Sequence, residues 1–182
     1  MLPTSRSLGA LAGALGLALA LAPAGFTRGD DLGGESAGTV ALFRKTDPGL
    51  GRFFDASAGY AVFPTVGKGG VGIGGAYGKG VLYERGKPVG EARLTQVTLG
   101  LQLGGQAYSE VIFFENEATL KSFKRGQFAV AAQASAVAAA EGVAAHARYE
   151  LGVAIFTIAK GGLMYEASVG GQKFSFSPYG RR

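Results

Sequence analysis

Two glycine and serine patterns in this sequence could support chemistry. Residues 67, 69 and 72, and likewise residues 70, 72 and 75, fit G-x-G-x-x-G, which binds dinucleotides when the glycines open a helix. Residues 34–38 fit G-x-S-x-G, which presents a nucleophilic serine between a strand and a helix. Strand continues after the glycines, and the serine pattern follows a tail that we expect to be flexible. We therefore predict neither nucleotide binding nor a serine nucleophile.

The acidic and histidine residues predict no metal or acid–base site. Glu110, Glu115 and Glu117 could supply the two carboxylates of glycosidic chemistry, but carboxylates that flank a strand and open a helix are usually solvated. His146 is the only histidine and lies in an alanine-rich segment without neighbouring metal ligands. The absence of cysteine excludes thiolate catalysis and sulfur-based zinc sites. We expect no catalytic residue, no metal and no cofactor.

The element that must position any site is residues 60–84. Between residues 68 and 80 glycine recurs with the two-residue period of a strand, so one face is almost bare while Tyr77 and Lys79 share the other with Val71 and Ile73. The bare face consists of Gly70, Gly72, Gly74, Ala76, Gly78 and Gly80. Strands tolerate glycine where a second backbone comes close or where the sheet bends. We predict a tightly curved strand at the middle of a small β-rich domain.

Helices are predicted on both sides of this strand. Residues 39–57 fit one or two short helices, with Asp47 and Pro48 as the cap and first-turn proline between them. Asn116 is placed to cap a further helix over residues 117–125. The helix over residues 39–57 either covers the open side of the sheet or lies on a membrane.

Further strands follow the glycine stretch. Residues 96–104 alternate as a half-buried strand with Val97 on its apolar side, and residues 109–115 predict a strand buried on both sides. Residues 128–147 fit a helix or a strand equally, and residues 149–176 predict three strands. The predicted fold class is α+β: a mainly antiparallel, strongly curved or barrel-like glycine-rich sheet with a few short covering helices.

The N-terminal residues predict export. Residues 1–24 combine the basic Arg6, an uncharged apolar run over residues 8–21 and small residues suited to cleavage after Ala22 or Ala24, as in a signal peptide. An uncleaved anchor is the alternative. We expect a periplasmic or secreted protein, or one peripherally bound to a membrane, that begins with a flexible segment over residues 25–38.

Length and composition indicate one domain over residues 39–177, followed by a solvated tail over residues 178–182. The chain has 182 residues, of which 47% are hydrophobic and 17% charged, which fits a single packed core. Its net charge of +5 is spread along the chain and forms no dense basic stripe. We therefore expect no nucleic-acid partner.

Several ordered motifs over residues 39–176 resemble the SYLF domain, also called the Ysc84 actin-binding domain. The motifs are AVFP at residues 61–64, KGG at 68–70, GGAYG at 74–78, GVL at 80–82, LQLGGQ at 101–106 and GGLMYEASVGGQK at 161–173. The resemblance implies a non-enzymatic lipid-binding module, because eukaryotic relatives bind phosphoinositide membranes and the yeast type binds actin filaments. It also implies that the segment from Phe128 is at least partly strand.

The resemblance also implies a binding site. Lys68, with Gly69 and Gly70 of the same motif, is the expected lipid headgroup contact, followed by Lys160 and Lys79. An apolar strand precedes Lys-Gly-Gly at both Lys68 and Lys160, so we expect these two lysines on a common rim. Exposed turn lysines are the structural alternative.

The expected partner is a membrane lipid or an apolar ligand, and the alternative is a protein of the cell envelope. The chain has no cysteine to acylate, unlike many bacterial relatives. An exported protein would meet neither cytosolic phosphoinositides nor actin, so actin is not an expected partner.

Overall fold

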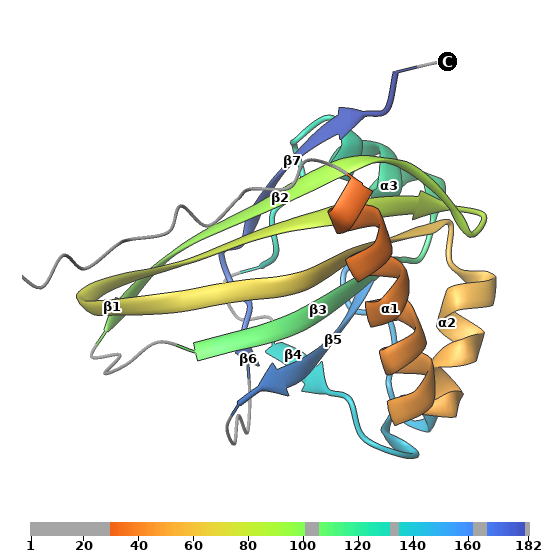
Figure 1. Cartoon of the computed structure of the whole chain (residues 1–182), viewed down its shortest axis with the longest axis horizontal. Helices are drawn as coiled ribbons and strands as arrows, with labels where there is room; N and C mark the ends of the chain where they lie inside the picture. The colour runs from red at the N-terminus through yellow and green to blue at the C-terminus, as the bar shows by residue number, and fades with distance from the viewer. Residues whose placement is uncertain (1–29, 101–105, 132–134, 162–166, 181–182) are drawn as a thin grey trace, which may run out of the picture.

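The protein folds into one twisted sheet with helices on both faces (Figure 1). The computed structural model describes residues 30–100, 106–131, 135–161 and 167–180. Its elements are α1 (Asp30–Thr46), η1 (Pro48–Leu50), α2 (Gly51–Ala56), β1 (Gly59–Glu84), β2 (Lys87–Gly100), β3 (Gln106–Phe114), α3 (Glu117–Lys124), β4 (Ser135–Ala138), η2 (Val143–Ala145), β5 (Val153–Lys160), β6 (Ala167–Ser168) and β7 (Lys173–Pro178). The predicted α+β class is confirmed. No helix in these ranges has the length and apolar character needed to cross a membrane.

β1 is a single strand that turns back on itself (Figure 1). Its first arm pairs with β3 and its second arm pairs with β2. The arms lie side by side, since Tyr60 of the first stacks on Tyr83 of the second with ring centroids 5.0 Å apart. A Cβ atom at Gly78 would lie 2.9 Å from the Val66 side chain, and one at Gly80 would collide with the Val62 carbonyl oxygen. The bare face therefore lets two backbones approach closely, which confirms the prediction of a tightly curved strand.

The sheet is open. Its strand order is β6-β4-β5-β3-β1-β2-β7, and the end strands β6 and β7 are two and six residues long. Neighbouring strands are antiparallel except β4 and β5, so the mainly antiparallel prediction is confirmed. The barrel-like expectation is not met, because in the described ranges the short end strands do not pair with each other.

The two residues that were predicted as helix N-caps, Asp47 and Asn116, cap helices in the structure. The Oδ1 atom of Asp47 accepts a hydrogen bond from the Gly49 N–H at 2.9 Å, which opens η1. The Oδ1 atom of Asn116 accepts one from the Thr119 N–H at 3.0 Å, which opens α3. In both cases a short polar side chain satisfies a backbone N–H that has no partner within the helix.

The expectation of a flexible segment over residues 25–38 is wrong for residues 30–38, which form the first half of α1. Three glycines in this half disfavour a helix. However, Ser36 and Phe43 are both fully buried, so packing of α1 against the rest of the protein outweighs the local preference. Residues 1–29, with the predicted signal peptide, lie outside the described ranges.

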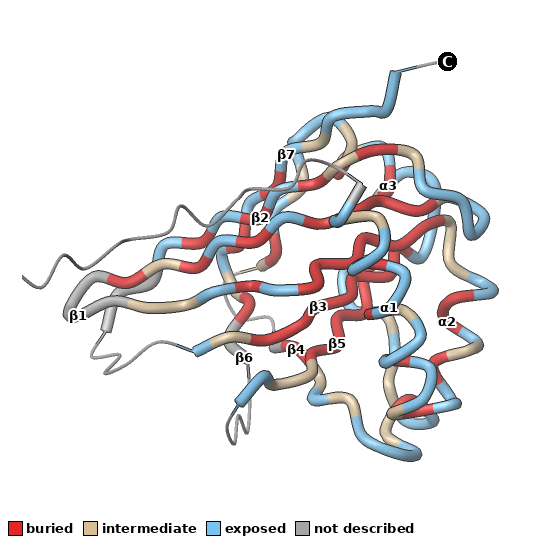
Figure 2. Tube along the Cα trace, viewed as in Figure 1, coloured by how far each residue is buried: buried red, intermediate tan, exposed pale blue. Residues whose placement is uncertain are grey.

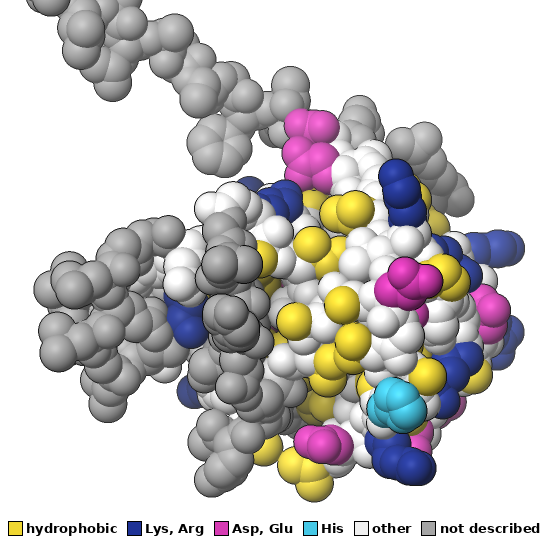
Figure 3. Space-filling model, turned by 90° about the horizontal axis from the view of Figure 1, so that it is seen from below, with side chains coloured by type: hydrophobic (Ala, Val, Ile, Leu, Met, Phe, Trp, Pro, Cys, Tyr) yellow, Lys and Arg dark blue, Asp and Glu magenta, His cyan; other side chains and the backbone are white. Residues whose placement is uncertain are grey.

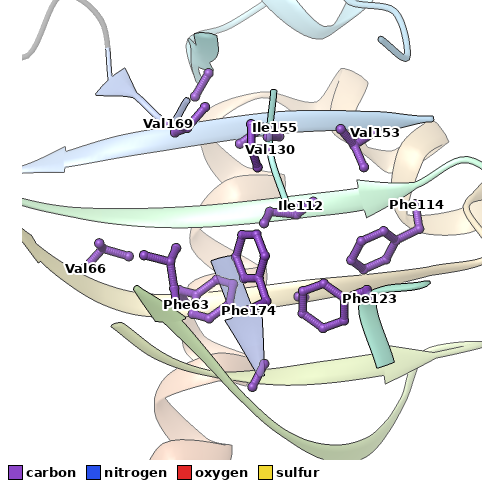
Figure 4. Packing of buried hydrophobic residues seen from close by; sticks show 14 of the residues in the cluster. Phe63, Val66, Ile112, Phe114, Phe123, Val130, Val153, Ile155, Val169 and Phe174 are labelled. Carbon is purple, nitrogen blue, oxygen red and sulfur yellow. The ribbon is translucent and has the colours of Figure 1, made fainter. Parts of the chain in front are cut away.

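Each face of the sheet has its own apolar core, and buried residues alternate along the strands between the two (Figure 2). On the face covered by α1 and α2, the α1 face, Phe53 packs on Phe113 with ring centroids 5.4 Å apart. On the opposite face, the α3 face, Phe174 lies between Phe63 and Phe123 at centroid distances of 5.9 and 5.1 Å (Figure 4).

The prediction that Val97 lies on the apolar side of its strand is wrong. Val97 is 76% exposed, whereas its neighbour Gln96 is only 4% exposed. Ala92 and Leu94 are fully buried in the α3-face core, and the two-residue period continues this burial to Gln96. The Nε2 atom of Gln96 donates a hydrogen bond to the Gly170 carbonyl oxygen at 2.8 Å, which compensates for burying an amide.

The alanine-rich segment contains a short strand and a short helix. Within residues 128–147, β4 pairs with both β5 and β6, and η2 follows it. The segment is therefore partly strand, as the family resemblance implied. The three strands predicted over residues 149–176 are also present, as β5, β6 and β7.

Candidate functional site

Part of the α1 face is not covered by the helices of the described ranges, and it carries exposed basic and apolar side chains. α1 crosses one end of the sheet, and the paired arms of β1 and β2 extend beyond it (Figure 1). We call this surface the open sheet face and define it by six exposed residues: Tyr77, Lys79, Arg93, Thr95, Val97 and Lys173.

Strand register brings these residues together from β1, β2 and β7. Tyr77 lies opposite Thr95, and Thr95 lies opposite Lys173 on its other side. In the next row on the same face, two residues along each strand, Lys79 lies opposite Arg93. Side chains directly opposed in an antiparallel pair have Cβ atoms about 5 Å apart. Three cations therefore occupy two adjacent rows of the sheet.

This clustering of cations favours an anionic partner. Lys79 and Arg93 place two positive charges at directly opposed positions of one strand pair. A surface that carries many phosphates would attract these cations, and the attraction would weaken as salt screens it.

Apolar side chains lie among these cations. Tyr77 is 49% exposed and Val97 is 76% exposed. Val97 lies opposite Gly75, which leaves the valine without a side-chain neighbour across that pair. Basic residues interspersed with exposed aromatic and aliphatic ones are typical of surfaces that meet the headgroup region of a membrane.

The predicted binding lysines are divided between the two faces of the sheet. Lys79 belongs to the open sheet face. Lys160 lies elsewhere on the α1 face, where its Nζ donates a hydrogen bond to Thr65 Oγ1 at 2.7 Å. Lys68 lies two residues from Val66 of the α3-face core, so its side chain is on the α3 face. Partial burial there lowers the pKa of Lys68.

Lys68 and Lys160 therefore share an end of the sheet but do not form a common rim. Ala107 of β3 lies opposite both Gly67 and Lys160, which places the two lysines one residue apart in level on the strands that flank β3. The alternation of side chains then directs them to opposite faces. Gly69 and Gly70 lie between the two arms of β1, where the strand backbone is continuous.

Sequence reasoning missed Arg93, Lys173, Tyr77 and Val97 as members of one surface. The signal that could have found them is the alternation of small or apolar residues with polar ones over residues 91–95. Continued past residue 95, this alternation places residue 97 on the exposed side, but the apolar character of Val97 suggested the buried side.

The three glutamates considered for acid chemistry lie in different environments. Glu110 is fully buried and accepts a hydrogen bond at its Oε2 from Gln172 Nε2 at 3.0 Å. Glu115 lines a cavity of about 580 Å³ with Arg52 and Arg148, and no second carboxylate is among the described residues that line it. Glu117 lies in the first turn of α3. The arrangement thus brings no pair of these glutamates into one pocket.

His146 lines the same cavity. In the described ranges no cluster of three His, Cys, Asp or Glu side chains could hold a metal ion. Seen from below, the surface around the single histidine carries basic, acidic and apolar side chains side by side (Figure 3). This mixture contrasts with the basic character of the open sheet face.

Comparison with known proteins identifies the family. Residues 95–178 match the family model Ysc84, described as "Las17-binding protein actin regulator". Residues 95–178 belong to the Ysc84 family. It is also 30% identical over 137 residues to "Beta cell expansion factor A" of Aeromonas veronii, which covers 74% of this chain. The chain spans about half, 51%, of the length of that relative. The predicted family resemblance is confirmed, and the Ysc84 match includes the last six residues of β2 and all of β7.

Proposed function

We propose that this Ysc84-family domain is a non-enzymatic module that binds anionic lipid through the open sheet face. The observation that supports this most is the cross-strand grouping of Lys79, Arg93 and Lys173 beside exposed Tyr77 and Val97. The cations would contact headgroup phosphates, and the two apolar side chains would enter the region between headgroups and acyl chains. In an exported protein this face would meet lipids of the cell envelope.

Vesicle co-sedimentation tests this proposal. We compare Arg93→Glu/Lys173→Glu with the control Lys87→Glu/Lys121→Glu, which makes the same change of charge at exposed positions outside the open sheet face. Each basic residue near an anionic membrane contributes roughly 1 kcal/mol, so losing two should weaken binding at least about thirty-fold. The control should lose much less.

The vesicles are phosphatidylcholine with or without phosphatidylglycerol, at low and at physiological salt. A third set with phosphoinositides tests whether the headgroup of the eukaryotic relatives is preferred. Absence of binding to anionic vesicles at low salt, or equal loss of binding in the two variants, would contradict the proposal.

The second candidate function is a protein-interaction module. The family description names a Las17-binding actin regulator, so a protein partner is consistent with membership of the family. Crosslinking in cells from an introduced cysteine at Val97 distinguishes the two functions. A stoichiometric protein adduct together with no vesicle binding would favour the second.

A further inference from the structure

A groove separates α1 from the strands beneath it. Its volume is about 320 Å³, and it is lined by Glu35, Gly38, Thr39 and Leu42 of α1 and by Pro64, Thr65, Ser109 and Lys160 of the sheet. None of these residues belongs to the open sheet face. The groove therefore offers a second place where this domain can bind a ligand.

The walls of the groove carry opposite charges that do not neutralise each other directly. Glu35 is exposed on the α1 wall, and Lys160 is exposed on the β5 wall. Within the described ranges the two groups form no ion pair, and Lys160 instead donates its hydrogen bond to Thr65 Oγ1. A carboxylate and an ammonium group that face one cavity without touching are complementary to a ligand with both charges.

The rest of the lining suits a small polar ligand with a short carbon backbone. Thr39 Oγ1 donates to the Glu35 carbonyl oxygen at 2.8 Å, and Ser109 Oγ donates to the Pro64 carbonyl oxygen at 2.8 Å. Each of these hydroxyl oxygens still has lone pairs that can accept a hydrogen bond from an ammonium group. Leu42, which is 43% exposed, supplies an apolar contact.

Gly38 keeps the groove open. Glycine in the interior of a helix reduces helix stability. A Cβ atom at Gly38 would meet no atom within 4 Å, so close packing does not explain the absence of a side chain. Gly38 lines the groove, so a larger side chain at this position would fill space that a ligand needs.

We propose that this groove binds a zwitterion in which a phosphodiester and a primary ammonium are a few atoms apart. The phosphate lies against Lys160 and the ammonium lies against Glu35. This chemistry occurs in soluble glycerophosphoethanolamine and in the headgroup of phosphatidylethanolamine. The inference does not depend on the proposed function, since it uses other residues.

Calorimetric titration of the full chain tests the assignment of the two charges. Glycerophosphoethanolamine is compared with glycerophosphoglycerol, which has the same phosphodiester and no ammonium. We expect the zwitterion to bind up to about five-fold more tightly, which is the upper limit for one exposed ion pair. Glu35→Gln should make the two ligands equal, and Lys160→Gln should weaken both. Equal affinities in the wild type, or an unchanged ratio in Glu35→Gln, would overturn the proposal.

Gly38→Met tests the groove without changing any charge. This variant should melt at or above the wild-type temperature, since the position is open and methionine is a better helix former than glycine, and it should lose the zwitterion. Binding that persists in a folded Gly38→Met protein would also overturn the proposal. Arg93→Glu/Lys173→Glu should retain zwitterion binding, which separates this site from the open sheet face.

Vesicles of phosphatidylcholine with or without phosphatidylethanolamine identify the source of the ligand. Enhanced binding to the ethanolamine vesicles that Gly38→Met abolishes assigns the site to a lipid headgroup. Binding of the soluble compound alone assigns it to a free small molecule. Binding of neither would contradict the inference.

Discussion

Glu110 is a carboxyl group inside the α3-face core, and its ionisation should oppose folding. Its Oε2 atom accepts a hydrogen bond from Gln172, but its Oε1 atom is buried with no partner in the described part of the chain. Gln172 also donates to the Tyr108 hydroxyl at 3.4 Å. Burial raises the pKa of Glu110 to about 8, and the hydrogen bond from Gln172 offsets this only in part. At pH 7 the folded protein therefore holds this carboxyl mostly in its neutral form.

The raised pKa fixes how stability changes with pH. An unfolded chain releases the Glu110 proton near pH 4.5, whereas the folded protein keeps it until about pH 8. Between these values the unfolded state binds fewer protons, so the free energy of unfolding falls as pH rises. Each pKa unit of difference corresponds to about 1.4 kcal/mol of stability. The free energy of unfolding should therefore fall by roughly 5 kcal/mol over the whole window, and by about 3 kcal/mol between about pH 5.5 and 8.

Glu110→Gln should remove most of this dependence. The amide has nearly the shape of the carboxylic acid and no charge, and it adds an N–H donor beside Gln172, whose Oε1 atom is also buried without a partner in the described ranges. Urea unfolding across this pH range measures the effect. We expect a decrease of about 3 kcal/mol for the wild type, a change below about 1 kcal/mol for the variant, and a more stable variant at the upper end.

His146→Asn is the matched control. Histidine is the side chain that ordinarily titrates between pH 5 and 8, and this chain has one. The control should keep the wild-type slope. The reasoning would be refuted by wild-type stability that rises with pH in this window, or by a slope that survives in Glu110→Gln and disappears in His146→Asn.

Two further substitutions test the fold. Gly80→Ala should destabilise the protein by at least about 2 kcal/mol in urea unfolding, because its Cβ atom would collide with the Val62 carbonyl oxygen. Gly67→Ala in the same strand is the control, since its Cβ atom would meet no atom within 4 Å. Equal losses of stability in the two variants would contradict the fold-back of β1. Asp47→Ala should lower the free energy of unfolding by roughly 3 kcal/mol, because Asp47 accepts hydrogen bonds from the N–H groups of Gly49 and Ala144 at 2.9 and 2.7 Å. Hydrogen exchange at the Ala144 amide should become faster in this variant. An unchanged exchange rate would contradict the hydrogen bond between Asp47 and Ala144.

Sequence patterns predicted the features that depend on residues close together in the sequence. The glycine period of β1 indicated both the strand and its close backbone approach, and Asn116 marked the start of α3. Asp47 was predicted as a helix cap, and it is one. Its second hydrogen bond, to the Ala144 N–H, joins residues 97 positions apart, and no local pattern contains that information.

Features that depend on tertiary packing were predicted wrongly or missed. The glycines of residues 30–38 suggested flexibility, yet packing around Ser36 and Phe43 orders this half of α1. Val97 is apolar but exposed, because the face of β2 is set by the buried Ala92 and Leu94. The open sheet face combines residues of three strands, so it could be recognised only once the register of β2 with β1 and β7 was known.

The central claim is that the open sheet face contacts anionic lipid, and a single fluorescent label tests it most directly. The chain has no cysteine, so an environment-sensitive fluorophore can be attached at Val97→Cys alone, and at Lys121→Cys in α3 on the opposite face as the control. On adding phosphatidylglycerol vesicles, the label at residue 97 should shift to the emission of an apolar environment while the label at residue 121 stays unchanged. Equal shifts at both positions, or a shift at residue 121 alone, would contradict the account.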